Sequence, residues 1–425
     1  MGDETGMAEE TGAAQIGSAD SGPTPGNPLL RGTQAPPVMA ARAWIADKTF
    51  PEDRPLLNMS QAAPADPPPE SLRARMAAAM AEDATHLYGA VLGNDALRAE
   101  IAAQWSAAYE GDIAPRDVAV TAGCNQAFCA AIETVAGPGD AVILPTPWYF
   151  NHEMWLRMAG VEAIPLPCDM GHGALPSLAG AAAAITPRTR AIVLVTPNNP
   201  TGAEYSPALI EGFFELAQEH GLALIVDETY RDFLSREGAP HGLFARDDWR
   251  GTLIHLYSFS KVFRLTGHRV GAMICAPERL AQAEKFLDTV TICPPQLGQI
   301  AALEGLRTLS DWVAAERAEV LARRDRLLEA AKSLPAGWRV LSVGAYFAYL
   351  HHPFDAPSEV VAKALVDQQS LLCLPGSMFA PPAAENPDAG SAHWAGQTLR
   401  LAFANCGLDG IDEAMRRLAA FEMAE

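Results

Sequence analysis

The chain has 425 residues, of which 49% are hydrophobic, and a formal net charge of −20 at pH 7. This length is enough for two domains with a large core, and no apolar run is long enough to cross a membrane. The negative charge argues against nucleic acids and anionic membranes as partners, although a local pocket could still hold a small anionic ligand.

Cysteine usage indicates the cellular compartment. The seven cysteines are scattered along the chain, and none forms a Cys-x-x-Cys pair. An odd number without metal-ligand spacing is typical of reduced thiols, so we expect a cytoplasmic protein with no metal site.

Residues 1–40 differ in composition from the rest of the chain. They are rich in Gly, Ala, Thr, Pro and acidic residues and have no hydrophobic periodicity. They also lack the apolar core of a signal peptide and the arginine-rich pattern of a transit peptide. We therefore expect them to form a disordered tail.

Residues 71–310 are predicted to form a large α/β domain. Apolar runs typical of strands buried in a parallel sheet alternate here with helical segments. The clearest runs are residues 117–121, 141–144, 189–195 and 222–226. This alternation predicts a mostly parallel sheet with helices on both faces.

Residues 311–425 are predicted to form a smaller α+β domain. A long amphipathic helix over 312–334 links it to the large domain, and the segment 380–396 reads as a flexible loop. The remaining elements are predicted as a strand over 338–350, a helix over 358–369, strands over 371–374 and 398–404, and a helix over 411–423.

Polar residues follow several strands of the large domain. Gly123, Cys124 and Asn125 form a turn before a helix, where free backbone amides can bind an anion. Asn199 lies in an Asn-Pro-Thr-Gly turn, and Asp227 ends an apolar strand, where a buried carboxylate needs a cationic partner. The carboxyl ends of parallel strands form one edge of a sheet, and ligands bind there.

The most informative segment contains Lys261. Ser258 and Ser260 precede it, and Arg269 follows between two glycines. A partly desolvated amine has a pKa lowered towards neutrality, so it can hold an aldehyde as a Schiff base and act as a general base. The pattern Ser-x-Ser-Lys followed by Gly-x-Arg-x-Gly resembles that of the class I/II aminotransferases, which are fold-type I enzymes dependent on pyridoxal phosphate.

This resemblance covers about residues 45–420 and implies a fold and a cofactor. The expected fold is α/β, with a large domain built on a mostly parallel, seven-stranded sheet between helices and a smaller α+β domain. The implied cofactor is pyridoxal 5′-phosphate bound through Lys261, and the implied assembly is a homodimer. Residues 41–70 match the N-terminal arm of the family, with Ala62 where a glycine is usual.

The resemblance also implies roles for single residues around the cofactor. Asp227 is expected to contact the pyridine nitrogen, while Asn199 and Tyr230 contact the 3-oxygen. Trp148 is expected to stack on the ring, with Tyr149 as the alternative and core packing as the simpler reading of both. The expected phosphate contacts are Gly123, Cys124, Asn125, Ser258, Arg269 and, at the site of the neighbouring subunit, Tyr88. Ser260 is expected to bind the cofactor as well.

The substrate is expected to be held by a second set of residues. Arg400 would grip the α-carboxylate of an amino acid, because a guanidinium offers two parallel hydrogen bonds. Ala62, Trp148 and Asn199 complete the predicted substrate contacts.

The expected reaction is transfer of an amino group from an α-amino acid to a 2-oxo acid. A carbon-sulfur lyase, or another eliminating or cyclising enzyme of the same fold, is the alternative, because these enzymes share the same residues. Asn125 stands where some aspartate-using relatives have a lysine, which favours neutral or aromatic substrates. A ligand-sensing transcription regulator is disfavoured, because the N-terminal segment is too short and too acidic for a helix-turn-helix.

Overall fold

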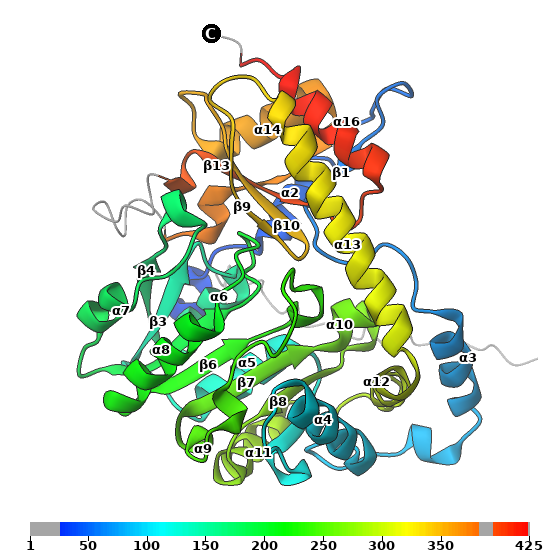
Figure 1. Cartoon of the computed structure of the whole chain (residues 1–425), viewed down its shortest axis with the longest axis vertical. Helices are drawn as coiled ribbons and strands as arrows, with labels where there is room; N and C mark the ends of the chain where they lie inside the picture. The colour runs from blue at the N-terminus through cyan, green and yellow to red at the C-terminus, as the bar shows by residue number, and fades with distance from the viewer. Residues whose placement is uncertain (1–25, 382–393, 424–425) are drawn as a thin grey trace, which may run out of the picture.

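The protein is described here from a computed structural model that places residues 26–381 and 394–423. Figure 1 shows a large part built on a twisted sheet and a small part above it, with the long helix α13 (Ser310–Ala330) running between them. Most of the segment 380–396, predicted as a flexible loop, lies outside the described residues.

The large part contains the predicted seven-stranded sheet. Its order is β2-β8-β7-β6-β5-β3-β4, and β8 is antiparallel to both of its neighbours while the other pairs are parallel. The strands span Val118–Thr121 (β2), Ala141–Thr146 (β3), Glu162–Pro167 (β4), Thr189–Val195 (β5), Ala223–Asp227 (β6), Leu253–Ser258 (β7) and Gly271–Ile274 (β8).

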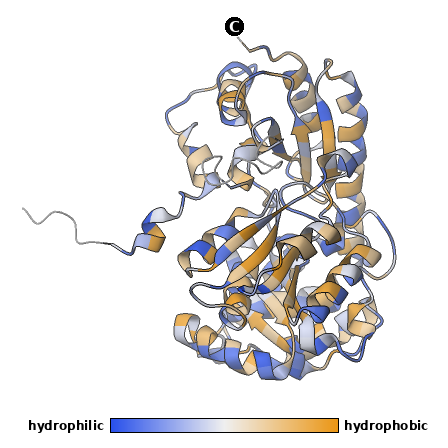
Figure 2. Cartoon of the chain, turned by 90° about the vertical axis from the view of Figure 1, so that its left-hand side faces the viewer, coloured by the Kyte–Doolittle hydropathy of each residue, from blue (hydrophilic) through white to orange (hydrophobic). Residues whose placement is uncertain are grey.

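Both faces of this sheet are covered by helices, which explains the continuous apolar runs in the sequence. In β5, Ile192 and Leu194 pack with one set of helices, whereas Ala191 and Val193 pack with the other. Figure 2 shows the central strands as hydrophobic and the surrounding helices as mixed. The first set includes α3 (Glu70–Ala79), α4 (Asp95–Ala108), α8 (Pro207–Glu219) and α12 (Gln296–Thr308), and the second α5 (Cys124–Glu133), α6 (Phe150–Met158) and α11 (Pro277–Thr291). None of the helices in the described ranges has the length and hydropathy needed to cross a membrane.

The small part is an α+β unit, as predicted. Its four-stranded antiparallel sheet has the order β12-β13-β10-β9. The predicted single strand over 338–350 is in fact a hairpin, because Ala345 takes a positive φ of 44° in a turn between β9 and β10. The elements span Arg339–Gly344 (β9), Phe347–His351 (β10), Ser358–Gln369 (α14), Leu371–Leu372 (β11), Leu374–Pro375 (β12), Thr398–Ala402 (β13) and Leu408–Ala419 (α16).

The two parts meet at a pair of glycines. Gly202, in the turn after β5, has a φ of +77°, and a Cβ atom there would lie 2.4 Å from the backbone nitrogen of Gly344. A side chain at either position would push the two backbones apart. The loop that carries Asn199 therefore rests directly against the hairpin of the small part.

The N-terminal segment corrects one prediction. Residues 1–25 of the expected tail lie outside the described residues, but its remainder contains the short helix α1 (Pro28–Gly32) and the beginning of a second, α2 (Pro37–Ala43). Each begins with a proline at a first-turn position, where the missing N–H costs nothing. Ala41 is fully buried against Phe150 and Phe379, and this contact holds α2 on the body of the protein. Residue 57 then begins β1 (Leu57–Asn58), which pairs with β11.

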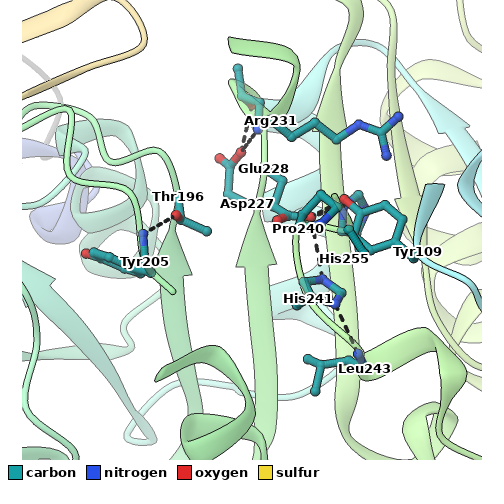
Figure 3. A network of polar contacts seen from close by, with 12 residues as sticks. Tyr109, Thr196, Tyr205, Asp227, Glu228, Arg231, Pro240, His241, Leu243 and His255 are labelled. Carbon is teal, nitrogen blue, oxygen red and sulfur yellow. Dashed lines mark hydrogen bonds and ion pairs between the residues drawn. The ribbon is translucent and has the colours of Figure 1, made fainter. Parts of the chain in front are cut away.

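A buried polar network fixes the carboxyl end of β6 (Figure 3). Glu228 directly follows Asp227 and points to the opposite side of the sheet, where its Oε2 lies 2.9 Å from His255 Nε2 and 3.5 Å from His241 Nε2. The Tyr109 hydroxyl donates a hydrogen bond to the same oxygen. Burial opposes the ionisation of Glu228, but the contacts with the two histidines outweigh it and lower its pKa.

We expect Glu228→Gln to destabilise the protein in a pH-dependent way. Losing charge-assisted hydrogen bonds should lower the free energy of unfolding by about 2–3 kcal/mol at pH 7. Because the folded-state pKa of Glu228 lies below its ordinary value of 4.5, its stabilisation is complete above that pH and is lost as the pH falls below it. Urea unfolding at pH 7 and pH 4 measures this. An equal difference in stability between variant and wild type at the two pH values would contradict this prediction, and Glu284→Gln, at an exposed residue of α11, serves as the control.

Candidate functional site

One cavity, of about 380 Å³, lies at the carboxyl ends of the parallel strands, between the large and small parts. Of the fourteen residues predicted for the site, it brings eleven together. These are Ala62, Cys124, Asn125, Asn199, Asp227, Tyr230, Ser258, Ser260, Lys261, Arg269 and Arg400.

The amino terminus of α5 forms one end of this cavity. Gly123 is the N-cap residue, with a φ of +87°, and a Cβ atom there would lie 2.2 Å from a guanidinium nitrogen of Arg269. The positive φ favours glycine at this position, and a side chain there would also displace the guanidinium of Arg269. The first amides of a helix lack partners within the helix, so they and the guanidinium form a site that suits a phosphate. The Arg269 side chain is held by Thr266, whose carbonyl oxygen accepts a 3.0 Å hydrogen bond.

A carboxylate forms the floor of the cavity. Asp227 is 4% exposed, and its Oδ1 accepts hydrogen bonds from the backbone N–H and the hydroxyl of Thr229, at 3.0 and 2.7 Å. Its Oδ2 lies 3.4 Å from His152 Nε2. Burial raises the pKa of Asp227, but the contacts with His152 and Thr229 outweigh this and lower it. The residue is therefore an anion suited to a protonated ring nitrogen.

His152 and Thr229 were not predicted. Thr229 follows Asp227 by two residues, a spacing at which a hydroxyl reaches an aspartate in a turn. His152 lies in α6, and its ring stacks on Phe128 with centroids 3.8 Å apart. No local pattern in the sequence could place that ring beside Asp227.

Lys261 lies in the short helix α10 (Phe259–Val262), directly after β7. Burial, together with the charges of Arg269 and Arg400, lowers its pKa to about 8. Its Nζ donates a 2.6 Å hydrogen bond to the carbonyl oxygen of Ala62 in the N-terminal arm. An amine in this state is neutral in part of the molecules at neutral pH, and can act as a nucleophile or a base.

Arg400 lies opposite, on β13 of the small part, and is 2% exposed. Its guanidinium donates to Asn199 Oδ1 at 3.1 Å and to the carbonyl oxygen of Ser60. Burial lowers its pKa to about 10. Its Nε is buried without a hydrogen-bond partner. No carboxylate among the residues that the structure describes pairs with this guanidinium. A buried cation with spare donor capacity suits the carboxylate of a ligand.

The structure corrects the expectation for Trp148. This side chain lies outside the cavity and packs in the core with Leu144 and Val161. Tyr149, the alternative, lines the cavity, and its hydroxyl donates to Asn125 Oδ1 at 3.3 Å. Neighbouring side chains on this loop point in different directions. Because a loop has no regular periodicity, the sequence could not show which of the two faces the cavity.

Tyr88 also lies outside the cavity of its own chain. Its side chain is 80% exposed. The loop that carries it is held by Gln296, whose side-chain amide donates to the carbonyl oxygen of Leu87 at 3.2 Å. The predicted contact of Tyr88 with a phosphate is therefore not made within one chain.

The N-terminal helix adds a wall that was not predicted. Pro36, Val38 and Arg42 line the cavity, with Gln61 of the arm beside them. Sequence composition could not predict these contacts, because a short helix that packs on another element does not need a hydrophobic periodicity of its own.

Comparison with known proteins agrees with this geometry. A probable N-succinyldiaminopimelate aminotransferase of Mycobacterium tuberculosis is 32% identical over 378 residues, which is 85% of this chain and 91% of that protein. An arginine–pyruvate transaminase of Pseudomonas aeruginosa is 30% identical over 79% of this chain and 82% of that protein. These relatives are aminotransferases, which supports transamination over the lyase or cyclising alternative.

Solved structures and a family profile extend the comparison. The structure of N-succinyldiaminopimelate aminotransferase from M. tuberculosis superposes with a TM-score of 0.82 and 27% identity, covering 93% of this chain and 99% of that one. Aspartate aminotransferase of Thermus thermophilus, at 24% identity and a TM-score of 0.82, shows the same fold over 93% of this chain and 99% of that one. The profile described as aminotransferase class I and II matches residues 54–418. The chain therefore belongs to the class I and II aminotransferases, enzymes of this fold that use pyridoxal 5′-phosphate.

Proposed function

We propose that the cavity holds pyridoxal 5′-phosphate between α5 and Lys261, and that an amino acid and then a 2-oxo acid bind beside Arg400. One observation carries this proposal. A partly buried amine, that of Lys261, has a pKa of about 8 and shares a single cavity with an ionised Asp227 and with the helix terminus next to Arg269. These are the groups that an aldehyde, a ring nitrogen and a phosphate require.

The chain's own groups divide the work of binding the cofactor. When bound, pyridoxal phosphate supplies an aldehyde for amines and a ring that takes up the electron pair of a breaking bond. Asp227 favours a proton on the ring nitrogen, and Thr229 and His152 keep this carboxylate ionised and in place. Tyr149, rather than Trp148, supplies the aromatic side chain beside the ring.

The groups that act on the substrate are Lys261, Arg400 and Asn199. Arg400 binds the α-carboxylate, and Asn199 orients this guanidinium through their 3.1 Å hydrogen bond. Lys261 Nζ accepts the α-proton, because a pKa of about 8 allows it both to gain and to release a proton near neutrality. Water is excluded as the arm closes the cavity through Ala62.

Borohydride reduction of the purified protein tests the role of Lys261. We expect a stable pyridoxyl label on the peptide that contains Lys261, because this is the buried amine beside the proposed ring site. Lys261→Ala should bind the cofactor without a covalent label, whereas Lys285→Ala, which removes an exposed lysine in α11, should be labelled as wild type. Peptide mapping by mass spectrometry is the measurement, and a label on another lysine would end this assignment.

We further propose that the active unit is a homodimer in which Tyr88 reaches the phosphate site of the other subunit. An exposed apolar surface supports this, formed by side chains of one loop and of the neighbouring carboxyl end of α11 that are each 43% exposed or more. The backbone N–H of Gly89 joins these two segments by a 3.4 Å hydrogen bond to Cys293 Sγ. The surface consists of Leu87, Tyr88, Val290 and Ile292.

Mixing two inactive variants tests this arrangement. If Tyr88 acts across the interface, hybrids of Tyr88→Phe and Lys261→Ala contain one intact site and one site that lacks both groups. Random mixing of equal amounts should restore activity to about a quarter of wild type. If Tyr88 acts within its own chain, no intact site forms and the activity of the mixture is half that of Tyr88→Phe alone, which would refute the proposal. Light scattering confirms the dimer in each sample.

The seven cysteines support a cytoplasmic location, because all of them are free and five are buried.

The named substrates of the relatives include both succinyldiaminopimelate and arginine, so family membership leaves the side chain of the substrate open. The residues that line the cavity must therefore determine which substrate side chain is accepted.

A further inference from the structure

The cavity is lined by far more positive than negative charge. Four basic side chains, Arg42, Lys261, Arg269 and Arg400, face a single carboxylate, Asp227. The whole chain has the opposite sign, with a net charge of −20. An excess of cations in a cavity of this kind selects ligands with several anionic groups.

Three of the four cations have a role in the proposed function, and Arg42 is left over. It lies in the last turn of α2, and its NH2 donates a 2.8 Å hydrogen bond to Gln61 Oε1. This amide is neutral, so it orients the guanidinium without balancing its charge. Within the described ranges, no carboxylate forms an ion pair with Arg42.

The arm aligns this arginine with the other two groups that would contact a substrate. Along three consecutive residues, the Ser60 carbonyl accepts from Arg400, the Gln61 side chain from Arg42, and the Ala62 carbonyl from Lys261. The Gln61 backbone is itself held by Asn405, whose side-chain amide donates to its carbonyl oxygen at 2.9 Å. The arm segment over residues 60–62 therefore contacts Arg400, Arg42 and Lys261 at once, and it is itself held in place by Asn405.

We propose that Arg42 binds a second carboxylate at the far end of the substrate side chain, so that the enzyme acts on dicarboxylic amino acids. This inference rests on the proposed function. It replaces the expectation of neutral or aromatic substrates, which depended on Asn125 lacking a charge, because the cation comes from the N-terminal helix instead. Val38 and Phe150 line the same cavity and supply apolar surface for the methylene groups of the side chain.

Unreactive acids test this directly. The holoenzyme is titrated by calorimetry with succinate, glutarate and adipate, and with the monocarboxylates of equal carbon number, butyrate, valerate and hexanoate. A second charge-assisted contact should make the dicarboxylate of fitting length bind about tenfold or more tightly than its partner. Arg42→Gln should remove this difference while leaving monocarboxylate affinity unchanged, and Arg42→Lys should restore part of it. Arg31→Gln, at an exposed arginine of α1 outside the cavity, is the control and should match wild type.

Two results would overturn the inference. One is that wild type shows no preference for a dicarboxylate of any length, and the other is that the preference survives in Arg42→Gln. An ion pair of Arg42 with a partner subunit would give the first result. Borohydride labelling of the same samples separates this failure from failure of the proposed function, because a missing preference with Lys261 still labelled overturns only the role of Arg42.

Discussion

A cavity lined by four basic side chains and one carboxylate is the constraint on which the rest of the structure depends. Lys261 and Arg400 lose hydration in this cavity, which is costly without a compensating anion, and the positive charges of Arg269 and Arg400 act on Lys261 as well. The lowered pKa values of Lys261 and Arg400 are the direct result of this arrangement. The site is therefore organised for anionic ligands before any ligand binds, and one of its amines is already able to react.

The rigid sheet makes such an arrangement possible. Strands β5, β6 and β7 are buried on both faces, and their carboxyl ends present Asn199, Asp227 and Lys261 at one edge. The buried network around Glu228 holds the end of β6 from the side opposite the cavity, so Asp227 cannot turn away from it. The unfavourable desolvation of the Asp227 carboxylate is offset by its contacts with Thr229 and His152.

The small part and the N-terminal segment control access to this edge. Arg400 reaches the cavity from β13 and bonds to both Asn199 and the arm. The close contact of Gly202 with Gly344 sets how near the two parts lie. Helix α2 and the arm then close the remaining side, where Arg42 and Ala62 meet the cavity. The proposed contacts with the α-carboxylate and with the substrate side chain thus come from elements outside the central sheet.

The sequence by itself determined the family, the cofactor, the seven-stranded sheet and most of the cavity. These follow from local chemistry, because a lysine that follows two serines, an aspartate after a buried strand and a glycine before a helix each have a direct physical reason. Only the tertiary structure decided which residue of the Trp148–Tyr149 pair faces the cavity, since a loop has no periodicity that sets its register. It also decided that His152 contacts Asp227 and that Arg42 reaches the cavity. Both contacts depend on how separate helices pack, and that packing is set by the whole core rather than by neighbouring residues.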